Sequence, residues 1–190
     1  MGQVFFVGDL PFGHENIMRY DSRPFDTVED MDRELIRRWN EQVTADDDIV
    51  YILGDLSWHK VAATQAILKR LRGKKILIRG NHDKFVKDAS TAKMFDEIVP
   101  YKEIVIDDTL VVLCHYPIMC WKNRMRNSIH LYAHVHTSEV ADVVEDYKQT
   151  LINLQQPCRM YNVGCMKKYM KYAPQTLETI LQSNNDSIKK

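Results

Sequence analysis

The sequence is poor in cysteine, has no long hydrophobic run and carries no net charge. Its 190 residues include only four cysteines and no CxxC pair, so we expect neither a thiolate zinc site nor a dithiol redox motif. Basic and acidic residues both total 26, which provides no overall field toward nucleic acid or an anionic membrane. No apolar run reaches the roughly 20 residues of a membrane span. We therefore expect a cytoplasmic protein without a membrane partner.

What the chain does have is a high content of apolar residues arranged in short runs. Hydrophobic residues make up 45% of the sequence, which suits one globular domain, residues 1–190, with its own core. Seven runs rich in Val, Ile and Tyr predict β-strands at residues 3–8, 48–54, 74–80, 103–108, 110–115, 129–134 and 158–164.

Other segments show the spacing of amphipathic helices, at residues 27–43, 61–73 and 175–185. Thr27 is placed to cap the first of them, and Gly73 follows basic residues at the end of the second, as is typical of a helix C-terminus. Strand and helix alternate up to the third strand, and hairpin-like, β-rich segments are expected after Lys102. The pattern predicts a layered α/β fold.

The predicted strands share the type of residue that follows them. Five of them end in side chains that bind metals or act in catalysis: Asp9, Asp55, Asn81 with His82 and Asp83, His115, and His134 with His136. Ligands of an open α/β sheet bind outside the carboxyl ends of its strands, so these positions are expected to form one site. A single Asp or His after a strand is usually a turn or packing residue, but five coincidences favour a functional site.

The donor types indicate which metals such a site would bind. Carboxylate, amide and imidazole groups without a thiolate suit Mn²⁺, Fe or Zn²⁺. The candidate ligands outnumber one coordination sphere, and a carboxylate can bridge two ions about 3.5 to 4 Å apart. We expect two divalent ions, with Mn²⁺ favoured and Fe or Zn²⁺ as the alternatives.

The order of these residues resembles the calcineurin-like metallophosphoesterases, in particular small single-domain bacterial and phage members. The strings that carry the resemblance are FGHENI, ILGDLSW, RGNHD, CHYPI and LYAHVH, and the match runs from Val4 to about Tyr172. The resemblance implies an α/β fold in which a sandwich of two β-sheets is flanked by helices.

The resemblance also implies a role for each matching residue. Asp9, Asp55 and His136 would face one metal, and Asp55, Asn81, His115 and His134 would face the other, with Asp55 as the bridge. His82 would lie beside the leaving oxygen, and Asp83 would orient it by hydrogen bonding.

Two positions depart from the family pattern. Pro11 stands where the family usually has a metal-binding histidine, and proline has no donor atom. Water, which we favour, would complete the first metal site, or His14 would reach it, or the protein would work with one ion; in each case lower occupancy of the first site is expected. Ala133 stands where the family prefers glycine, and it is strained by about 1 kcal/mol or more if its φ is positive.

The resemblance implies a hydrolase in which a hydroxide shared by two metals attacks phosphorus directly. We expect a small phosphodiester as the substrate because no cap domain is evident, and phosphomonoester hydrolysis stays open. His14, Arg19, Lys122 and Arg124 are candidate substrate contacts, although a solvated basic loop explains the last two equally well. Arg23, Trp58 and His59 lie in loops near the ligands with the same ambiguity.

Two rival functions stay open. Pro11 is the kind of change that accompanies loss of catalysis, so a protein-binding scaffold with an impaired site is one alternative. A nuclease is the other, and the zero net charge of the chain speaks mildly against it.

Overall fold

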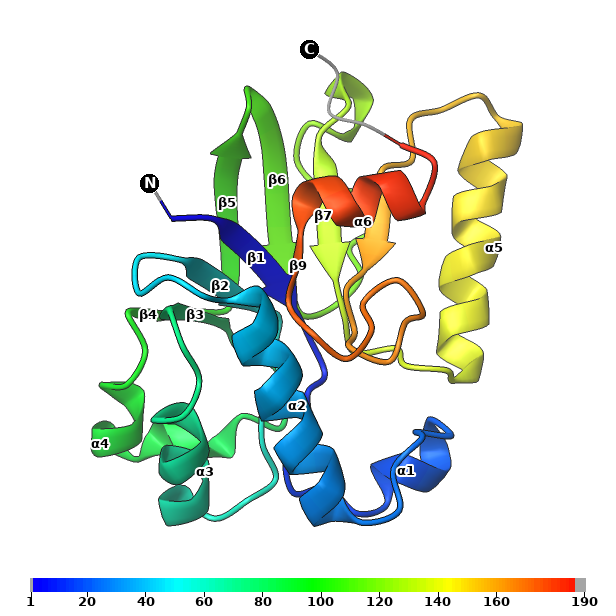
Figure 1. The fold of residues 1–190 in the computed structure, drawn as a ribbon. Helices are drawn as coiled ribbons and strands as arrows, with labels where there is room; N and C mark the ends of the chain where they lie inside the picture. The colour runs from blue at the N-terminus through cyan, green and yellow to red at the C-terminus, as the bar shows by residue number, and fades with distance from the viewer. Residues whose placement is uncertain (1, 187–190) are drawn as a thin grey trace.

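The strands form two sheets that pack against each other (Figure 1). The computed structural model describes residues 2–186. The first sheet has the strand order β4-β3-β2-β1-β9, with β1 at Val4–Val7, β2 at Ile49–Ile52, β3 at Lys74–Ile78, β4 at Glu97–Val99 and β9 at Gln175–Thr176. The second has the order β5-β6-β7-β8, with β5 at Tyr101–Ile106, β6 at Thr109–Cys114, β7 at Ile129–Tyr132 and β8 at Met160–Asn162.

Parallel pairing brings the ends of many strands to one edge. Strands β1 to β4 pair with one another in parallel, and so do β6, β7 and β8, whereas β9 joins the first sheet and β5 the second as antiparallel strands. The two sheets meet where the backbone N–H of Gly8 donates to the carbonyl of Val163 at 2.8 Å, just beyond the ends of β1 and β8. The loops that leave the carboxyl ends of both sheets therefore converge.

The core follows the two-residue period of the strands. Val111 and Leu113 of β6 are buried between the two sheets, whereas Val112 packs with Tyr132 and Val144 on the other face of the second sheet. The second sheet is thus covered on both faces, which holds the strand ends rigid.

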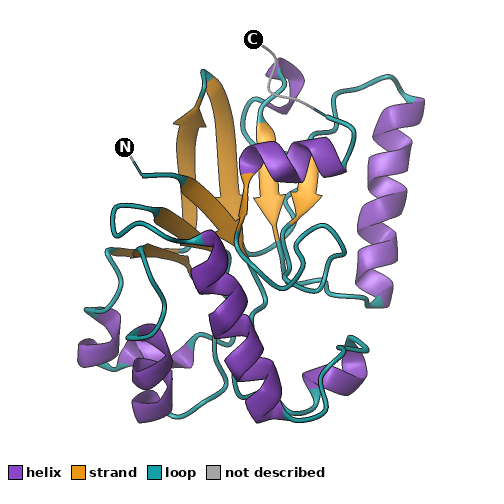
Figure 2. Ribbon diagram, viewed as in Figure 1, coloured by secondary structure: helices purple, strands orange, loops and turns teal. Residues whose placement is uncertain are grey.

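Helices cover the outer faces of the sandwich (Figure 2). Helices α2 and α6 pack on the side of the first sheet, and α5 lies along the second. The helices are α1 (Ile17–Tyr20), α2 (Val28–Gln42), α3 (Val61–Leu68), α4 (Ala89–Ala92), α5 (Glu139–Asn153) and α6 (Leu177–Ser183), with 3₁₀ turns at Lys84–Lys87 and Arg124–Arg126. Within residues 2–186, none of them combines the length and hydrophobicity needed to cross a bilayer.

The layered α/β prediction is confirmed, and all seven predicted strands are present. Thr27 caps α2 as expected, since its Oγ1 accepts a hydrogen bond from the backbone N–H of Asp30 at 3.1 Å. The predicted helix 61–73 is shorter than expected and ends at Leu68, because the chain turns there to bury Leu71 before Gly73, with φ of 75°, leads into β3.

The prediction for the chain after Lys102 is only partly right. Strands β5 and β6 do form a hairpin, and its turn residues Asp107 and Asp108 both have positive φ. Beyond β6, however, β7, α5 and β8 form a parallel β-α-β unit that the sequence pattern did not reveal. The reason is that α5 exposes several apolar side chains, among them Val140, Val143 and Ile152, which blurs its helical periodicity.

Candidate metal centre

The predicted ligands all lie in loops at the carboxyl ends of strands. Asp9 follows β1, Asp55 follows β2, Asn81 follows β3 and His115 directly follows β6, while His134 and His136 follow β7. The structure therefore brings together side chains that are up to 127 residues apart in the chain.

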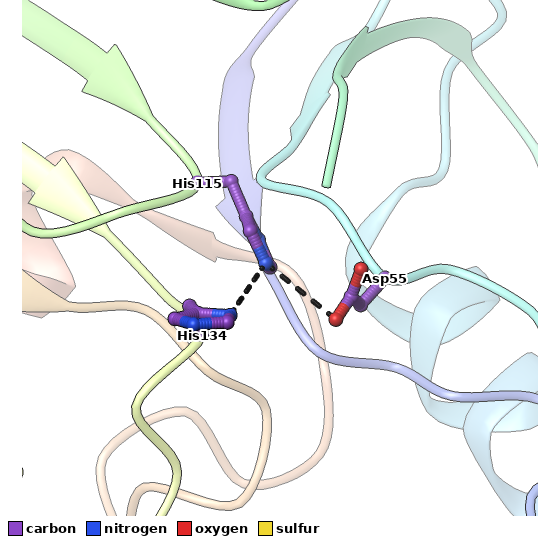
Figure 3. A group of neighbouring side chains, drawn as sticks. All are labelled: Asp55, His115 and His134. Carbon is purple, nitrogen blue, oxygen red and sulfur yellow. Dashed lines mark hydrogen bonds and ion pairs between the residues drawn. The ribbon is translucent and has the colours of Figure 1, made fainter. Parts of the chain in front are cut away.

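The closest group contains Asp55, His115 and His134, whose ligand atoms all lie within 4.8 Å of one another (Figure 3). His115 Nε2 is 3.1 Å from His134 Nδ1 and 3.5 Å from Asp55 Oδ2. Asn81 joins the group, because its Oδ1 lies 3.2 Å from the same His115 nitrogen. We call these four residues the Asn81 half of the site.

The hydrogen bonds of His115 show that this group fits a cation. Its Nδ1 lies 2.7 Å from the carbonyl oxygen of Leu53, which can only accept, so Nδ1 donates and neutral His115 presents a lone pair at Nε2. That lone pair faces the oxygens of Asn81 and Asp55, which are acceptors as well. Protonated His115 could donate to these acceptors, whereas with neutral His115 the converging lone pairs repel unless a cation lies between them, which is the environment of a metal ion.

The charges of the Asn81 half support one another. Burial disfavours the ionised forms of Asp55 and His115. The neighbouring His115 nevertheless holds the pKa of Asp55 below its usual value, and Asp55 in turn raises the pKa of His115. Burial and the proximity of His115 lower the pKa of His134. A divalent cation would reinforce ionised Asp55 and displace the proton from His115.

Asp9 and His136 form the Asp9 half of the site. His136 Nε2 lies 3.8 Å from Asp9 Oδ1, and burial raises the pKa of Asp9 to about 6. The carboxylate of Asp9 also accepts the backbone N–H of His134 at 3.0 Å. The two halves are thus linked through Asp9 and the His134 backbone.

Behind His136 lies a residue that the sequence did not single out. Asp21 Oδ2 accepts a hydrogen bond from His136 Nδ1 at 3.0 Å and also pairs with Arg23 at 2.9 Å. Burial opposes ionisation of Asp21, but the bond to His136 and the charge of Arg23 hold its pKa below the usual range. Asp21 thereby turns His136 Nε2 toward Asp9, the arrangement that metal-binding histidines commonly have.

Several predicted ligands have a strained backbone. Non-glycine residues rarely adopt the left-handed region, and it costs of order 1–3 kcal/mol each. Four predicted ligands adopt it: Asp9 (φ 51°), Asp55 (φ 54°), His134 (φ 72°) and His136 (φ 46°). Strain retained at these positions by the surrounding fold is characteristic of a functional site.

Two glycines make room for the ligands. A Cβ on Gly54 would lie 2.4 Å from His115 Nδ1, and a Cβ on Gly80 would lie 2.3 Å from Asp55 Oδ1. Ala133, the second departure from the family pattern, is absent from the residues with positive φ, so alanine is unstrained there.

Pro11 and His14 lie in the turn after β1. Pro11 is buried, and its carbonyl accepts the backbone N–H of His14 at 3.1 Å. The ring of His14 packs on Trp58 with the centroids 4.5 Å apart rather than joining the ligand atoms of either half. His14 does line the pocket of about 410 Å³ that also contains Asp55, His134 and His136.

His82 is exposed in the same pocket, and its ring packs on Trp58 at 4.4 Å between centroids. The carboxylate of Asp83 has other hydrogen-bond partners than expected. Its carboxylate accepts the backbone N–H groups of Asp55, Leu56 and Gly80 at 2.7–3.0 Å, so it joins the loops after β2 and β3 instead of hydrogen-bonding the His82 ring. The tilted ring contact with Trp58 is the contact that orients His82.

The three cationic candidates for substrate binding lie outside the lining of this pocket. Lys122 pairs with Glu103 at 2.6 Å, and Arg124 donates to the carbonyl of Pro157 and to Gln156. Arg19 is exposed on α1. Their role as phosphate contacts stays a prediction.

The comparisons with known proteins agree with this geometry. The family model for calcineurin-like phosphoesterases matches residues 3–152. Over 87 residues the chain is 46% identical to the uncharacterized protein MJ1445 of Methanocaldococcus jannaschii, covering 45% of this chain and 49% of that protein. Over 86 residues it is 36% identical to the Gene 66 protein of Mycobacterium phage L5, covering 44% and 41% of the two chains. The matched segment thus spans less than half the length of each of these relatives.

A crystal structure of a protein of unknown function from Aquifex aeolicus, AQ665, is similar over 92% of this chain and 95% of that one, with a TM-score of 0.66 and 27% identity. The fold, the strand-end ligands and the match of the family model over most of the sequence lead to one conclusion. This chain belongs to the family of calcineurin-like phosphoesterases.

Proposed function

We propose that the protein is a metal-dependent phosphodiesterase that acts on small phosphodiesters. The observation that carries the proposal is the convergence of lone pairs from Asp55, Asn81 and His115, each from a different strand end. The Asn81 half would hold one divalent ion, and Asp9, His136 and the shared Asp55 would hold the second. When bound, such ions supply Lewis acidity toward phosphoryl oxygens and a hydroxide nucleophile at neutral pH.

His82 is the residue of this chain best placed to assist the leaving group. Its exposed ring lines the same pocket as Asp55 and His134. Packing on Trp58 restricts the ring and holds it at the pocket wall, where a protonated ring nitrogen would donate to a departing alkoxide. General acid catalysis of this kind typically contributes about 10²- to 10⁴-fold.

The lining of the pocket favours a diester over a monoester. The side chains around it include four histidines, Tyr20 and Trp58 but no lysine or arginine. A phosphomonoester carries up to two negative charges at neutral pH and is usually met by cationic side chains, whereas a diester carries one. Tyr20 and Trp58 provide apolar surface for an organic substituent of the phosphate.

The test is hydrolysis of bis(4-nitrophenyl) phosphate, with 4-nitrophenyl phosphate in parallel, by chelator-treated protein titrated with Mn²⁺. Asn81→Ala removes one donor of the converging group, and Asn153→Ala, at the end of α5, is the matched control. Mn²⁺-dependent diester turnover that is lost only in Asn81→Ala is the expected result. No turnover of either ester at any Mn²⁺ concentration would refute the proposal and favour a protein-binding scaffold.

A further inference from the structure

A second pocket, of about 490 Å³, adjoins the metal centre on the side of Asn81. Its wall carries Arg79, Lys84 and Lys87, and we call it the basic pocket. Arg79 precedes the loop that holds Asn81 and His82, and the two lysines lie on the 3₁₀ turn that follows it.

The three cations of the basic pocket are exposed, and within the described part of the chain no carboxylate pairs with them. Asp83 is the one acidic residue on the pocket wall, and both of its oxygens are occupied by the backbone N–H groups of Asp55, Leu56 and Gly80. By contrast, Lys122 is neutralised by Glu103 on its own surface. The basic pocket thus concentrates positive charge in a chain whose net charge is zero.

The basic pocket and the metal centre share a wall. Asn81 Oδ1 lies 3.2 Å from His115 Nε2 on one side and 3.4 Å from the hydroxyl of Tyr116 on the other, and both Asn81 and Tyr116 line the basic pocket. Lys84 also borders a neighbouring pocket of about 560 Å³ together with His82 and Trp58. One molecule could therefore contact the metal centre and the cations at the same time.

We propose that the basic pocket binds a second phosphate group of the substrate while the scissile phosphodiester lies at the metal centre. This inference rests on the proposed function and names the substrate class, a phosphodiester that carries an additional phosphate. The charges divide accordingly, since the catalytic pocket has no lysine or arginine and the basic pocket has three such residues. Arg79 offers a planar fork for two phosphate oxygens, and Lys84 and Lys87 add compact charges.

The kinetic test uses two matched substrates, the 4-nitrophenyl ester of thymidine 5′-phosphate with and without a 3′-phosphate. The variant Arg79→Gln/Lys84→Gln/Lys87→Gln removes the cations of the pocket. The control Lys69→Gln/Arg70→Gln/Arg72→Gln removes the same charge from exposed residues after α3. The 3′-phosphate should lower KM at least tenfold in the native protein and in the control, and leave it unchanged in the pocket variant. The inference would be overturned if both substrates had the same KM in the native protein. It would also be overturned if the 3′-phosphate still lowered KM in the pocket variant.

A binding measurement separates this inference from the proposed function. Calorimetry on chelator-treated protein compares thymidine 3′,5′-bisphosphate with thymidine 5′-phosphate. The bisphosphate should bind several-fold more tightly, and only the pocket variant should lose the difference. If the protein does not hydrolyse diesters but still binds the bisphosphate more tightly than the monophosphate, the proposed function fails and phosphate binding by the basic pocket is retained. If turnover is present and the difference is absent, the inference alone fails.

The second phosphate could belong to a small molecule or to a nucleic acid, and a third substrate distinguishes the two. It replaces the 3′-phosphate with a short oligothymidylate that has no terminal phosphate. If only the substrate with the terminal 3′-phosphate has a lower KM, the natural substrate is a small molecule with two phosphate groups. An equal or larger advantage for the oligomer, with steep salt dependence, identifies a nucleic acid whose backbone occupies the pocket.

Discussion

The two halves of the metal centre are built in different ways. In the Asn81 half, donors from three other strand ends lie within 3.5 Å of His115 Nε2. In the Asp9 half, the donor atoms of Asp9 and His136 lie 3.8 Å apart, and Pro11 stands where the family resemblance implies a further ligand. His136 there depends on Asp21, which comes from the loop after α1 rather than from a strand end.

This difference shows that one half is positioned by the strands themselves and the other by a network of side chains. The Asn81 half is fixed by parallel strands whose spacing is set by backbone hydrogen bonds. The Asp9 half needs a buried aspartate, an arginine and a histidine in one network before its ligand points inward. We therefore expect the Asn81 half to bind its ion more tightly, and the following predictions test that comparison.

Asp55→Asn should have the largest effect, because Asp55 is the carboxylate that both halves would share. Its pKa is held low beside His115, so the native side chain is ionised and the amide removes a full charge. We expect a loss of at least about 10³-fold in kcat/KM and weaker Mn²⁺ binding at both positions. Calorimetric Mn²⁺ titration together with diester turnover measures both effects. A variant that still binds two ions with native affinity would show that Asp55 is not the bridge.

His82→Ala should lower kcat by about 10²- to 10⁴-fold and leave Mn²⁺ affinity unchanged. The loss should be larger for a substrate with an alkoxide leaving group than for one releasing 4-nitrophenol, because the better leaving group needs less protonation. Steady-state kinetics on the two substrates measures the difference. Equal losses would mean that His82 does not act on the leaving group.

Asp21→Asn should weaken only the Asp9 half. The amide cannot supply the charge that holds His136 Nδ1–H, so affinity for the more weakly bound Mn²⁺ should fall about 10- to 100-fold. The tighter Mn²⁺ should be unaffected, because Asp21 has no contact with the Asn81 half in the described structure. A calorimetric titration that resolves both ions is the measurement, and an equal loss at both sites would refute the assignment of Asp21 to one half.

Pro11→His should reduce the difference in Mn²⁺ affinity between the two halves. An additional protein ligand beside Asp9, His136 and the shared Asp55 should tighten binding of the weaker Mn²⁺ roughly tenfold. Pro11→Ala is the control, since it removes the proline without adding a donor. Unchanged affinity for the weaker ion in Pro11→His, with the fold intact by circular dichroism, would show that Pro11 does not occupy a ligand position.

His130→Gln should have the smallest effect on metal binding, because His130 lies outside both halves, and its effect should instead be on the pH dependence of stability. Its ring is buried, with Nδ1 donating to the carbonyl of Val112 and Nε2 accepting the N–H of Ile118, and burial lowers its pKa to about 4. The unfolded chain binds a proton at His130 near pH 6.5 and the folded chain does so only near pH 4, so stability is lost as pH falls through this window. This contribution to the free energy of unfolding should fall by about 2 kcal/mol between pH 7 and pH 5.

Denaturant titrations of the metal-free protein at the two pH values test the His130 prediction. His130→Gln removes the titrating group, so its stability should depend less on pH than that of the native protein. Identical pH dependence in the two proteins would mean that folding does not lower the pKa of His130.

Much of the fold and of the site could be predicted because the signals are local. Five strands are short apolar runs, each followed within three residues by a candidate ligand, as at Asp9, Asp55 and His115. The direction of the strands then places those residues at one edge. Helix α2 could be predicted for the same reason, since its cap and its buried face lie within one segment.

Other features depended on contacts between segments far apart in the chain. Asp21 is an ordinary polar loop residue in the sequence, and it gains its role from a hydrogen bond to His136 across 115 residues. Asp83 follows His82 directly but is turned away to the backbone of the β2 loop. Neither outcome could be predicted from neighbouring residues.

The sequence by itself determined the family, most of the strands and the candidate ligands, because each is written in a local pattern of hydrophobicity and donor atoms. Only the tertiary structure decided which acceptor each donor finds, that Arg79, Lys84 and Lys87 have no carboxylate partner among residues 2–186, and that the two halves differ in construction. The physical reason is that a hydrogen bond or ion pair within a folded chain depends on the distance between atoms, and that distance is set only when all the layers have packed together.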